Sequence, residues 1–129
     1  MIDFDTSMKK LRSVNGYLGS AVLNYSGETL YIDNDNTGTD IAYSASIFND
    51  AYRMVSESSL DVGFSEAASI EAKTLDGHVF LINSAGEFSS DNNTKLNVFS
   101  IFRDDGNVAL AKMIMDKASK SMSIELGKI

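Results

Sequence analysis

The run 33–38, Asp-Asn-Asp-Asn-Thr-Gly, is the stretch of the sequence that most resembles a metal-binding loop. It has side-chain oxygens at alternate positions and Gly38 at the sixth, as a calcium loop does. The twelfth position of a calcium loop holds a bidentate glutamate, whereas here it is Ser44. A polar loop that caps the following helix therefore explains the run better than a metal site.

Candidates for nucleophilic or acid–base catalysis are equally incomplete. The run 63–67, Gly-Phe-Ser-Glu-Ala, lacks the second glycine of a nucleophile elbow and precedes a predicted strand, where the motif requires a helix. His78, the only histidine, follows Asp-Gly at the start of a predicted strand, a position more typical of a surface residue than of a general base. Asp104 and Asp105 fit the start of a helix and are explained by capping. We therefore expect no catalytic residue and no enzyme activity.

The composition excludes further classes of function. The sequence has no cysteine, so disulfides and thiolate metal sites are absent, and we expect neither a metal nor a cofactor. A net charge of −7 disfavours binding to nucleic acid or to an anionic membrane surface. Residues 1–5 lack the basic start of a secretion signal, and no apolar run approaches transmembrane length. A cytoplasmic protein is the expectation.

The charge is unevenly distributed along the chain. Residues 28–91 contain twelve acidic and two basic residues, a net of −10, whereas the two remaining ends together have a net of +3. Two solvated faces would explain the difference, and so would an acidic surface that attracts a basic partner. The sequence leaves both interpretations open.

Three stretches of the chain have the apolar spacing of helices. The first covers residues 4–14 and stops at Asn15-Gly16, and the last begins near Val108. The middle helix is expected over 41–55, with Thr37 and Asp40 at capping-box spacing before it and a serine-rich break at 56–65 after it. Its apolar residues recur every three or four positions: Ile41, Ala45, Phe48, Tyr52 and Val55.

The remaining apolar stretches have the alternation or the turn residues of strands. Residues 17–24 and 29–32 flank a glycine-containing turn, and residues 68–73 and 78–82 flank Asp76-Gly77, so each pair is expected to form a hairpin. Residues 96–102 form a fifth predicted strand. We find no repeat or linker and expect a single domain over 1–129.

The order helix-strand-strand-helix-strand-strand-strand-helix, in a chain of this length, resembles the roadblock / dynein-light-chain family. Residues 14–30 are similar to the family's first hairpin, with a glycine and small apolar residues, a polar turn and then a leucine. Residues 106–112, Gly-Asn-Val-Ala-Leu-Ala-Lys, are similar to the entry into the family's last helix. The resemblance implies an α+β fold, a single α/β/α sandwich built on a five-stranded antiparallel sheet. The first and last helices would cover one face and the middle helix the other.

The resemblance also implies a homodimer, in which the third strands pair across a two-fold axis and the middle helices pack together. The dimer interface would then include Phe48 and Tyr52 on the middle helix and Ala68, Ile70 and Ala72 on the third strand. The apolar third strand fits this expectation, because an unpaired edge strand is normally protected by charge or proline. Phe48 and Tyr52 fit the core of a single chain equally well.

The function implied by the resemblance is that of a non-catalytic regulatory or scaffold protein that binds a small Ras-like GTPase or a motor or signalling complex. The acidic middle of the chain would face this partner around Asp50, Arg53 and Glu57. The alternative is a small-molecule sensor or binding module with a pocket between helix and sheet. Tyr17, Phe80 and Phe99 are the aromatic residues expected to line it.

Overall fold

A computed structural model describes residues 2–34, 38–89, 91 and 93–128. The predicted order of elements is confirmed: α1 (Phe4–Arg12), β1 (Tyr17–Asn24), β2 (Thr29–Asp33), α2 (Ile41–Asp61), β3 (Ser69–Lys73), β4 (His78–Ala85), β5 (Leu96–Arg103) and α3 (Val108–Leu126). Both predicted hairpins are present. Gly27 and Gly77 have positive φ in their turns, a backbone conformation that glycine adopts at little cost.

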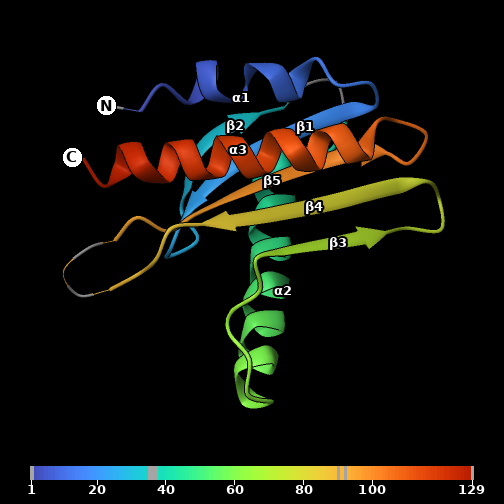
Figure 1. Cartoon of the computed structure of the whole chain (residues 1–129). Helices are drawn as coiled ribbons and strands as arrows, with labels where there is room; N and C mark the ends of the chain where they lie inside the picture. The colour runs from blue at the N-terminus through green and yellow to red at the C-terminus, as the bar shows by residue number, and fades with distance from the viewer. Residues whose placement is uncertain (1, 35–37, 90, 92, 129) are drawn as a thin grey trace.

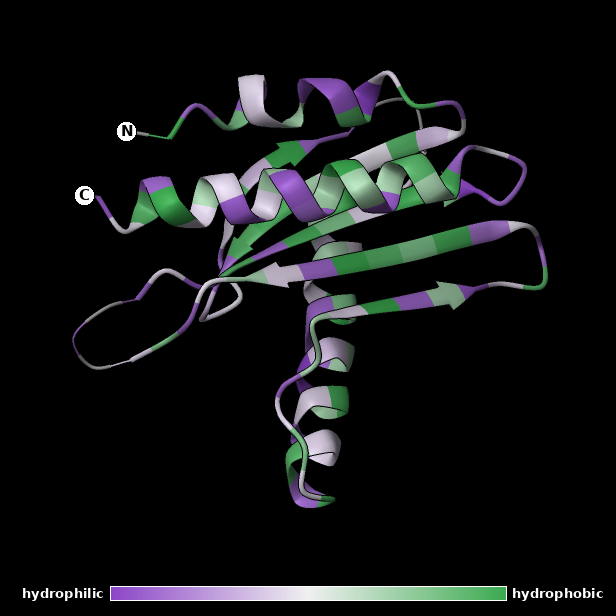
Figure 2. Ribbon diagram, in the orientation of Figure 1, coloured by the Kyte–Doolittle hydropathy of each residue, from purple (hydrophilic) through white to green (hydrophobic). Residues whose placement is uncertain are grey.

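The five strands form one antiparallel sheet in the order β2-β1-β5-β4-β3. The last strand, β5, lies between the two hairpins and pairs with β1 and β4, so β2 and β3 are the two edges (Figure 1). Green runs along most of β4, while β3 alternates between green and purple (Figure 2). The central strands are therefore apolar, and β3 has the pattern of an edge strand.

Helices cover both faces of the sheet. α1 and α3 pack on one face and α2 on the other, which confirms the expected α/β/α arrangement (Figure 1). β5 is buried on both sides, because Val98 and Phe102 point to the α1–α3 layer while Phe99 and Ile101 point to α2. Each face thus has a hydrophobic core of its own.

The close packing of α2 on the sheet depends on Gly19. A Cβ at this position of β1 would lie 2.6 Å from Cδ1 of Ile41 and 3.1 Å from a backbone oxygen of β2. Further along α2, the buried Asn49 accepts a hydrogen bond from Nδ2 of Asn97 on β5, at 2.7 Å. The Oδ1 atom of Asn97 has no hydrogen-bond partner among the described residues. A glycine and a buried amide pair therefore determine how α2 sits on the sheet.

α2 is longer than predicted at its C-terminal end. The serine-rich stretch does not end the helix at residue 55, because its serines hold the loop that returns to β3. Ser56 Oγ accepts from the backbone N–H of Ala67 at 3.1 Å, and Ser59 Oγ donates to the carbonyl oxygen of Ser65 at 2.6 Å. The helix continues to Asp61.

The helix caps differ in part from those expected. Asp40 caps α2 by accepting a hydrogen bond from the N–H of Tyr43 at 3.1 Å. Thr37 of the predicted capping box, like residues 35–37 of the calcium-like run, lies outside the described residues. Asn107 caps α3, and neither Asp104 nor Asp105 does so, because the side chain of Asn107 accepts from the N–H of Leu110.

Candidate protein-interaction site

α2 exposes an apolar stripe on the side that faces away from the sheet. Tyr43, Ile47 and Met54, four and seven positions apart, are 65%, 46% and 67% exposed. Val55, the next residue along the chain after Met54, is also exposed, at 46%. Exposed apolar residues that are contiguous on one helix face mark interaction surfaces more often than scattered ones do. These residues are called the α2 stripe below.

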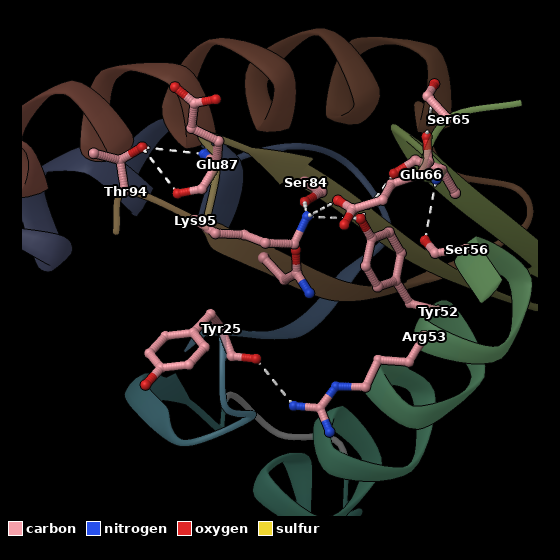
Figure 3. A network of polar contacts seen from close by, with 12 residues as sticks. Tyr25, Tyr52, Arg53, Ser56, Ser65, Glu66, Ser84, Glu87, Thr94 and Lys95 are labelled. Atoms are coloured by element: carbon pink, nitrogen blue, oxygen red, sulfur yellow. Dashed lines mark hydrogen bonds and ion pairs between the residues drawn. The ribbon is translucent and has the colours of Figure 1, made fainter. Parts of the chain in front are cut away.

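Next to the α2 stripe lies a line of charged residues. Asp50, Arg53 and Glu57 are spaced by three and four positions, so they share one side of the helix, and all three are exposed. Arg53 is held in place because its Nη2 donates to the carbonyl oxygen of Tyr25 at 3.0 Å (Figure 3). The structure thus brings the three predicted partner-binding residues together on one surface.

A cavity of about 210 Å³ opens beside this charged line. Arg53 and Glu57 form one wall, and the other includes Tyr25 from the β1–β2 turn and Phe88 from the segment after β4. The rings of Tyr25 and Phe88 stack with their centroids 4.1 Å apart and are 42% and 57% exposed. Exposed aromatic rings next to an arginine are typical of the residues that anchor protein interfaces.

Lys95 lines the same cavity and forms several hydrogen bonds there (Figure 3). Its Nζ donates hydrogen bonds to Tyr52 Oη at 3.0 Å, Glu66 Oε2 at 3.0 Å and Ser84 Oγ at 2.9 Å. Tyr52 Oη in turn donates to the carbonyl oxygen of Ala67 at 2.8 Å. Burial alone would lower the pKa of Lys95, but its hydrogen bonds to Tyr52 and Glu66 raise it above the usual value. The charged ammonium group of Lys95, just before β5, therefore connects the return loop after α2 (residues 62–68) to β4.

Two of the residues assigned to the dimer interface serve the core of a single chain. Tyr52 is only 2% exposed and packs between α2 and the sheet. Phe48 is half-buried and stacks on Phe80 and Phe99, with centroids 4.2 and 5.8 Å away. The exposed large apolar residues of α2 are instead Tyr43, Ile47, Met54, Val55 and Leu60. The spacing of Tyr43, Ile47 and Met54 opposite the buried stripe was visible in the sequence.

The predicted interface residues of the third strand lie at the edge of the sheet. Ile70 and Ala72 are half-buried on the α2 side, and Ala68, just before β3, is exposed. Glu71 faces the other side and forms an ion pair with Lys112 of α3. α2 crosses the sheet and projects past β3 (Figure 1). The C-terminal end of α2 therefore extends beyond the free edge of the sheet (Figure 1).

The aromatic residues proposed for a small-molecule pocket do not share one space. Phe80 and Phe99 face α2, whereas Tyr17 packs edge-on against Phe102 in the α1–α3 layer, because a register shift between Tyr17 and Gly19 interrupts the alternation of β1. Burial and a hydrogen bond to Asp33 raise the pKa of Tyr17. The prediction of a common pocket was wrong for Tyr17. A cavity of about 330 Å³ does lie between α2 and the sheet, bordered by Phe48 and Phe80.

The residues considered for catalysis are not assembled into a site. His78 Nδ1 lies 3.2 Å from Asp76 Oδ1 in the β3–β4 turn, and Asp105 pairs with Arg103. Hydrogen bonds from Thr74 and His78 lower the pKa of Asp76. Among the described residues, no three His, Asp or Glu side chains are grouped so that they could hold a metal ion. None of the helices in that part of the chain is long and apolar enough to cross a membrane.

An antiparallel sheet of this strand order, with two helices on one face and one on the other, is a roadblock-like α+β fold. The solved structure of Myxococcus xanthus MglB superimposes with a TM-score of 0.81 at 11% identity, over 100% of this chain and 98% of that one. The Roadblock/LC7 domain from Streptomyces avermitilis gives 0.78 at 15% identity, over 97% and 98% of the two chains. The gliding protein MglB from Thermus thermophilus gives 0.77 at 9% identity, over 97% and 88%. No protein-family model and no curated protein sequence matches the chain. The expected roadblock-like fold is thus confirmed, and at these identities the likeness concerns the fold alone.

Proposed function

We propose that this protein is a non-catalytic homodimer that acts as a regulator or scaffold by binding a small Ras-like GTPase. The observation that carries the proposal is the combination of the α2 stripe with the unpaired edge of β3. The α2 stripe is apolar and exposed, whereas β3 is a free edge of the sheet whose apolar residues Ile70 and Ala72 are half-buried on the α2 side. No described strand pairs with that edge. The GTPase as partner follows from the resemblance of the sequence to the roadblock family.

A two-fold dimer would use both features at once. Antiparallel pairing of two β3 strands would continue the sheet and occupy the free backbone groups of both edges. The end of α2 that projects past β3 would then lie over the second chain, where the α2 stripes would meet. Ile70 and Ala72 would extend the same apolar surface across the junction. The dimer would leave Asp50, Arg53 and Glu57 on the outer side of each α2.

The charged line and the cavity beside it form the surface that we assign to the partner. Asp50 and Glu57 belong to the segment 28–91 with its net charge of −10, so a GTPase surface rich in lysine and arginine would be attracted to it. Tyr25 and Phe88 would supply apolar contacts at the centre of the interface.

Sedimentation equilibrium at micromolar concentration tests the dimer. We expect a mass of twice the 14.0 kDa of one chain. Met54→Asp should give a folded monomer, because Met54 is 67% exposed and contributes little to the core. Met113→Asp is the matched control, since Met113 is 64% exposed on α3, on the other face of the sheet, and this variant should remain dimeric. A wild-type mass of 14.0 kDa, or equal behaviour of the two variants, would contradict the dimer.

Binding of a GTPase recovered by co-purification from the source cells tests the partner. Asp50→Lys combined with Glu57→Lys should weaken binding about tenfold and flatten its salt dependence, because two favourable charge pairs become repulsive. Glu125→Lys reverses a charge on α3, on the other face of the sheet, and should change neither quantity. If no GTPase is recovered, the choice of partner is wrong. If the double variant binds with unchanged affinity and salt dependence, the choice of partner surface is wrong.

The cavity between α2 and the sheet favours one alternative, a small-molecule binding module. Its volume of about 330 Å³ is large enough for a metabolite, and its walls are mainly apolar, with His78 and Asp76 near one end. A thermal-shift screen against a metabolite panel separates the two functions. Ser44 of α2 also lines the cavity and is not part of the α2 stripe. A ligand that stabilises the wild type but not a Ser44→Trp variant, in which the indole would occupy the cavity, would favour this module over the scaffold.

A further inference from the structure

α1 and α3 lie side by side on the face of the sheet opposite α2 (Figure 1). Their side chains leave a groove of about 450 Å³ between the two helices. Small side chains form part of both walls: Thr6 and Ser7 on α1, and Ala118 and Ser121 on α3. Because these side chains are too short to fill the space between the helices, the groove is open to solvent.

The α3 wall of the groove is apolar. Leu110 and Met113 are 41% and 64% exposed, and Ile114 beside them is half-buried. These residues are separate from the stripe of α3 that packs on the sheet, in which Ala111 and Met115 are fully buried. The groove therefore has apolar surface that no other described segment of this chain covers.

Two uncompensated lysines stand on opposite sides of this apolar surface. Lys10 comes from α1 and Lys117 from α3, and neither forms an ion pair within the described residues. Two other lysines of α3 are compensated, because Lys112 pairs with Glu71 and Lys120 pairs with Asp116. An apolar groove with free ammonium groups on both rims is complementary to a segment whose apolar side chains are flanked by carboxylates.

The structure of the groove favours a helical over an extended conformation for such a segment. Both walls are helices, whose backbone groups bond within the helix, and the free sheet edges at β2 and β3 are not part of the groove. An extended peptide would find no backbone partners there, whereas a helix satisfies its own backbone hydrogen bonds. The nine residues of α1 give a length of about 13 Å, enough for two or three turns.

We propose that the groove between α1 and α3 binds an acidic amphipathic helix of a partner protein. Docking here is compatible with the proposed dimer, which uses α2 and the edge strand β3, and with the proposed GTPase surface, which lies along α2 on the other face of the sheet. The chain would then connect two different partners through its two faces. The groove and the α2 surface can be tested independently of each other.

Two synthetic fluorescent peptides test the chemistry of the groove on the full chain. Both have about 14 residues, with leucines at i, i+3, i+4 and i+7; one has glutamates and the other lysines at the remaining positions. We expect the glutamate peptide to bind saturably, with an affinity that falls as salt is added, and the lysine peptide to bind at least about tenfold more weakly. Lys10→Glu combined with Lys117→Glu should reverse this preference, whereas Lys120→Glu should preserve it.

Methyl NMR of the methionines locates the bound peptide. Met113 in the groove and Met54 on α2 are almost equally exposed, at 64% and 67%, so they report on the two faces with similar sensitivity. We expect the glutamate peptide to shift the Met113 methyl resonance and to leave that of Met54 unchanged. Three results would overturn the proposal: no saturable binding below about 1 mM, equal affinity for the two peptides, or a shift at Met54 in place of Met113.

Discussion

Replacing Lys95 by methionine removes one ammonium group and keeps most of the length of the side chain. The Nζ atom donates to Tyr52, Glu66 and Ser84, and the Lys95 side chain is only 13% exposed. Tyr52 Oη keeps its bond to the carbonyl oxygen of Ala67 in the variant. Ser84 Oγ loses its hydrogen bond to Lys95, and Glu66 returns to water. The variant should fold but have a less firmly attached return loop.

The expected loss of stability follows from these contacts. The two part-buried hydrogen bonds to Tyr52 and Ser84 contribute about 1 kcal/mol each. The Glu66 carboxylate is 57% exposed, so its ion pair adds less than about 1 kcal/mol. Lys95→Met should therefore lower the free energy of unfolding by about 2–3 kcal/mol, which corresponds to a fall in Tm of about 10 °C for a chain of this size.

Urea unfolding followed by circular dichroism measures this loss, with protein concentration held fixed because dimerisation would contribute to stability. Lys120→Met is the matched control, since Lys120 forms an exposed i,i+4 pair with Asp116 and should cost less than about 0.5 kcal/mol. Hydrogen exchange at the Ala67 amide should accelerate only in Lys95→Met. If the two variants lose the same stability, Lys95 does not fasten the return loop.

Three further predictions concern the core and the turns. Gly86→Ala should cost more than about 3 kcal/mol in urea unfolding, because a Cβ there would lie 2.1 Å from a backbone oxygen, whereas Gly63→Ala also has a positive φ but open space and should cost about 1 kcal/mol. Asn49→Leu should cost about 2–3 kcal/mol by leaving the buried Asn97 amide unpaired, and replacing both residues by apolar ones should cost less than the single change. Because the pKa of Tyr17 is raised in the folded state, its contribution to stability is fully present below about pH 10, the pKa of an unfolded tyrosine, and is lost as the pH rises above it. Tyr17→Phe should therefore show a shallower decline of stability at alkaline pH, and an equal decline would contradict this assignment.

The elements that local chemistry determines were predictable from the sequence. The Asp76-Gly77 turn and the spacing of Ile41, Ala45 and Tyr52 predicted a hairpin and a buried helix face, and both are present. The C-terminal end of α2 was not predictable in this way, because Ser56 and Ser59 interact with a loop that follows later in the chain. Tertiary contacts there outweigh the tendency of serine to end a helix.

The interaction surface was only partly predictable. The charged residues Asp50 and Glu57 could be placed from spacing, because residues three or four positions apart share a helix side. The exposure of Ile47 and Met54 was missed because α2 is apolar on two opposite sides, and periodicity alone does not say which side meets the sheet. The position of Tyr17 depends on a register shift in β1 that leaves no signal in the residue types.

The buried pair of Asn49 and Asn97 allows α2 only discrete positions along its axis. A displacement by one helical turn, about 5.4 Å, would separate the two amides and leave each among apolar side chains without a partner. Intermediate positions would break the same bond without forming another. The hydrogen bond within each chain therefore fixes how far α2 projects past β3. In the proposed dimer, the positions of the two α2 helices relative to each other would be determined before the chains associate.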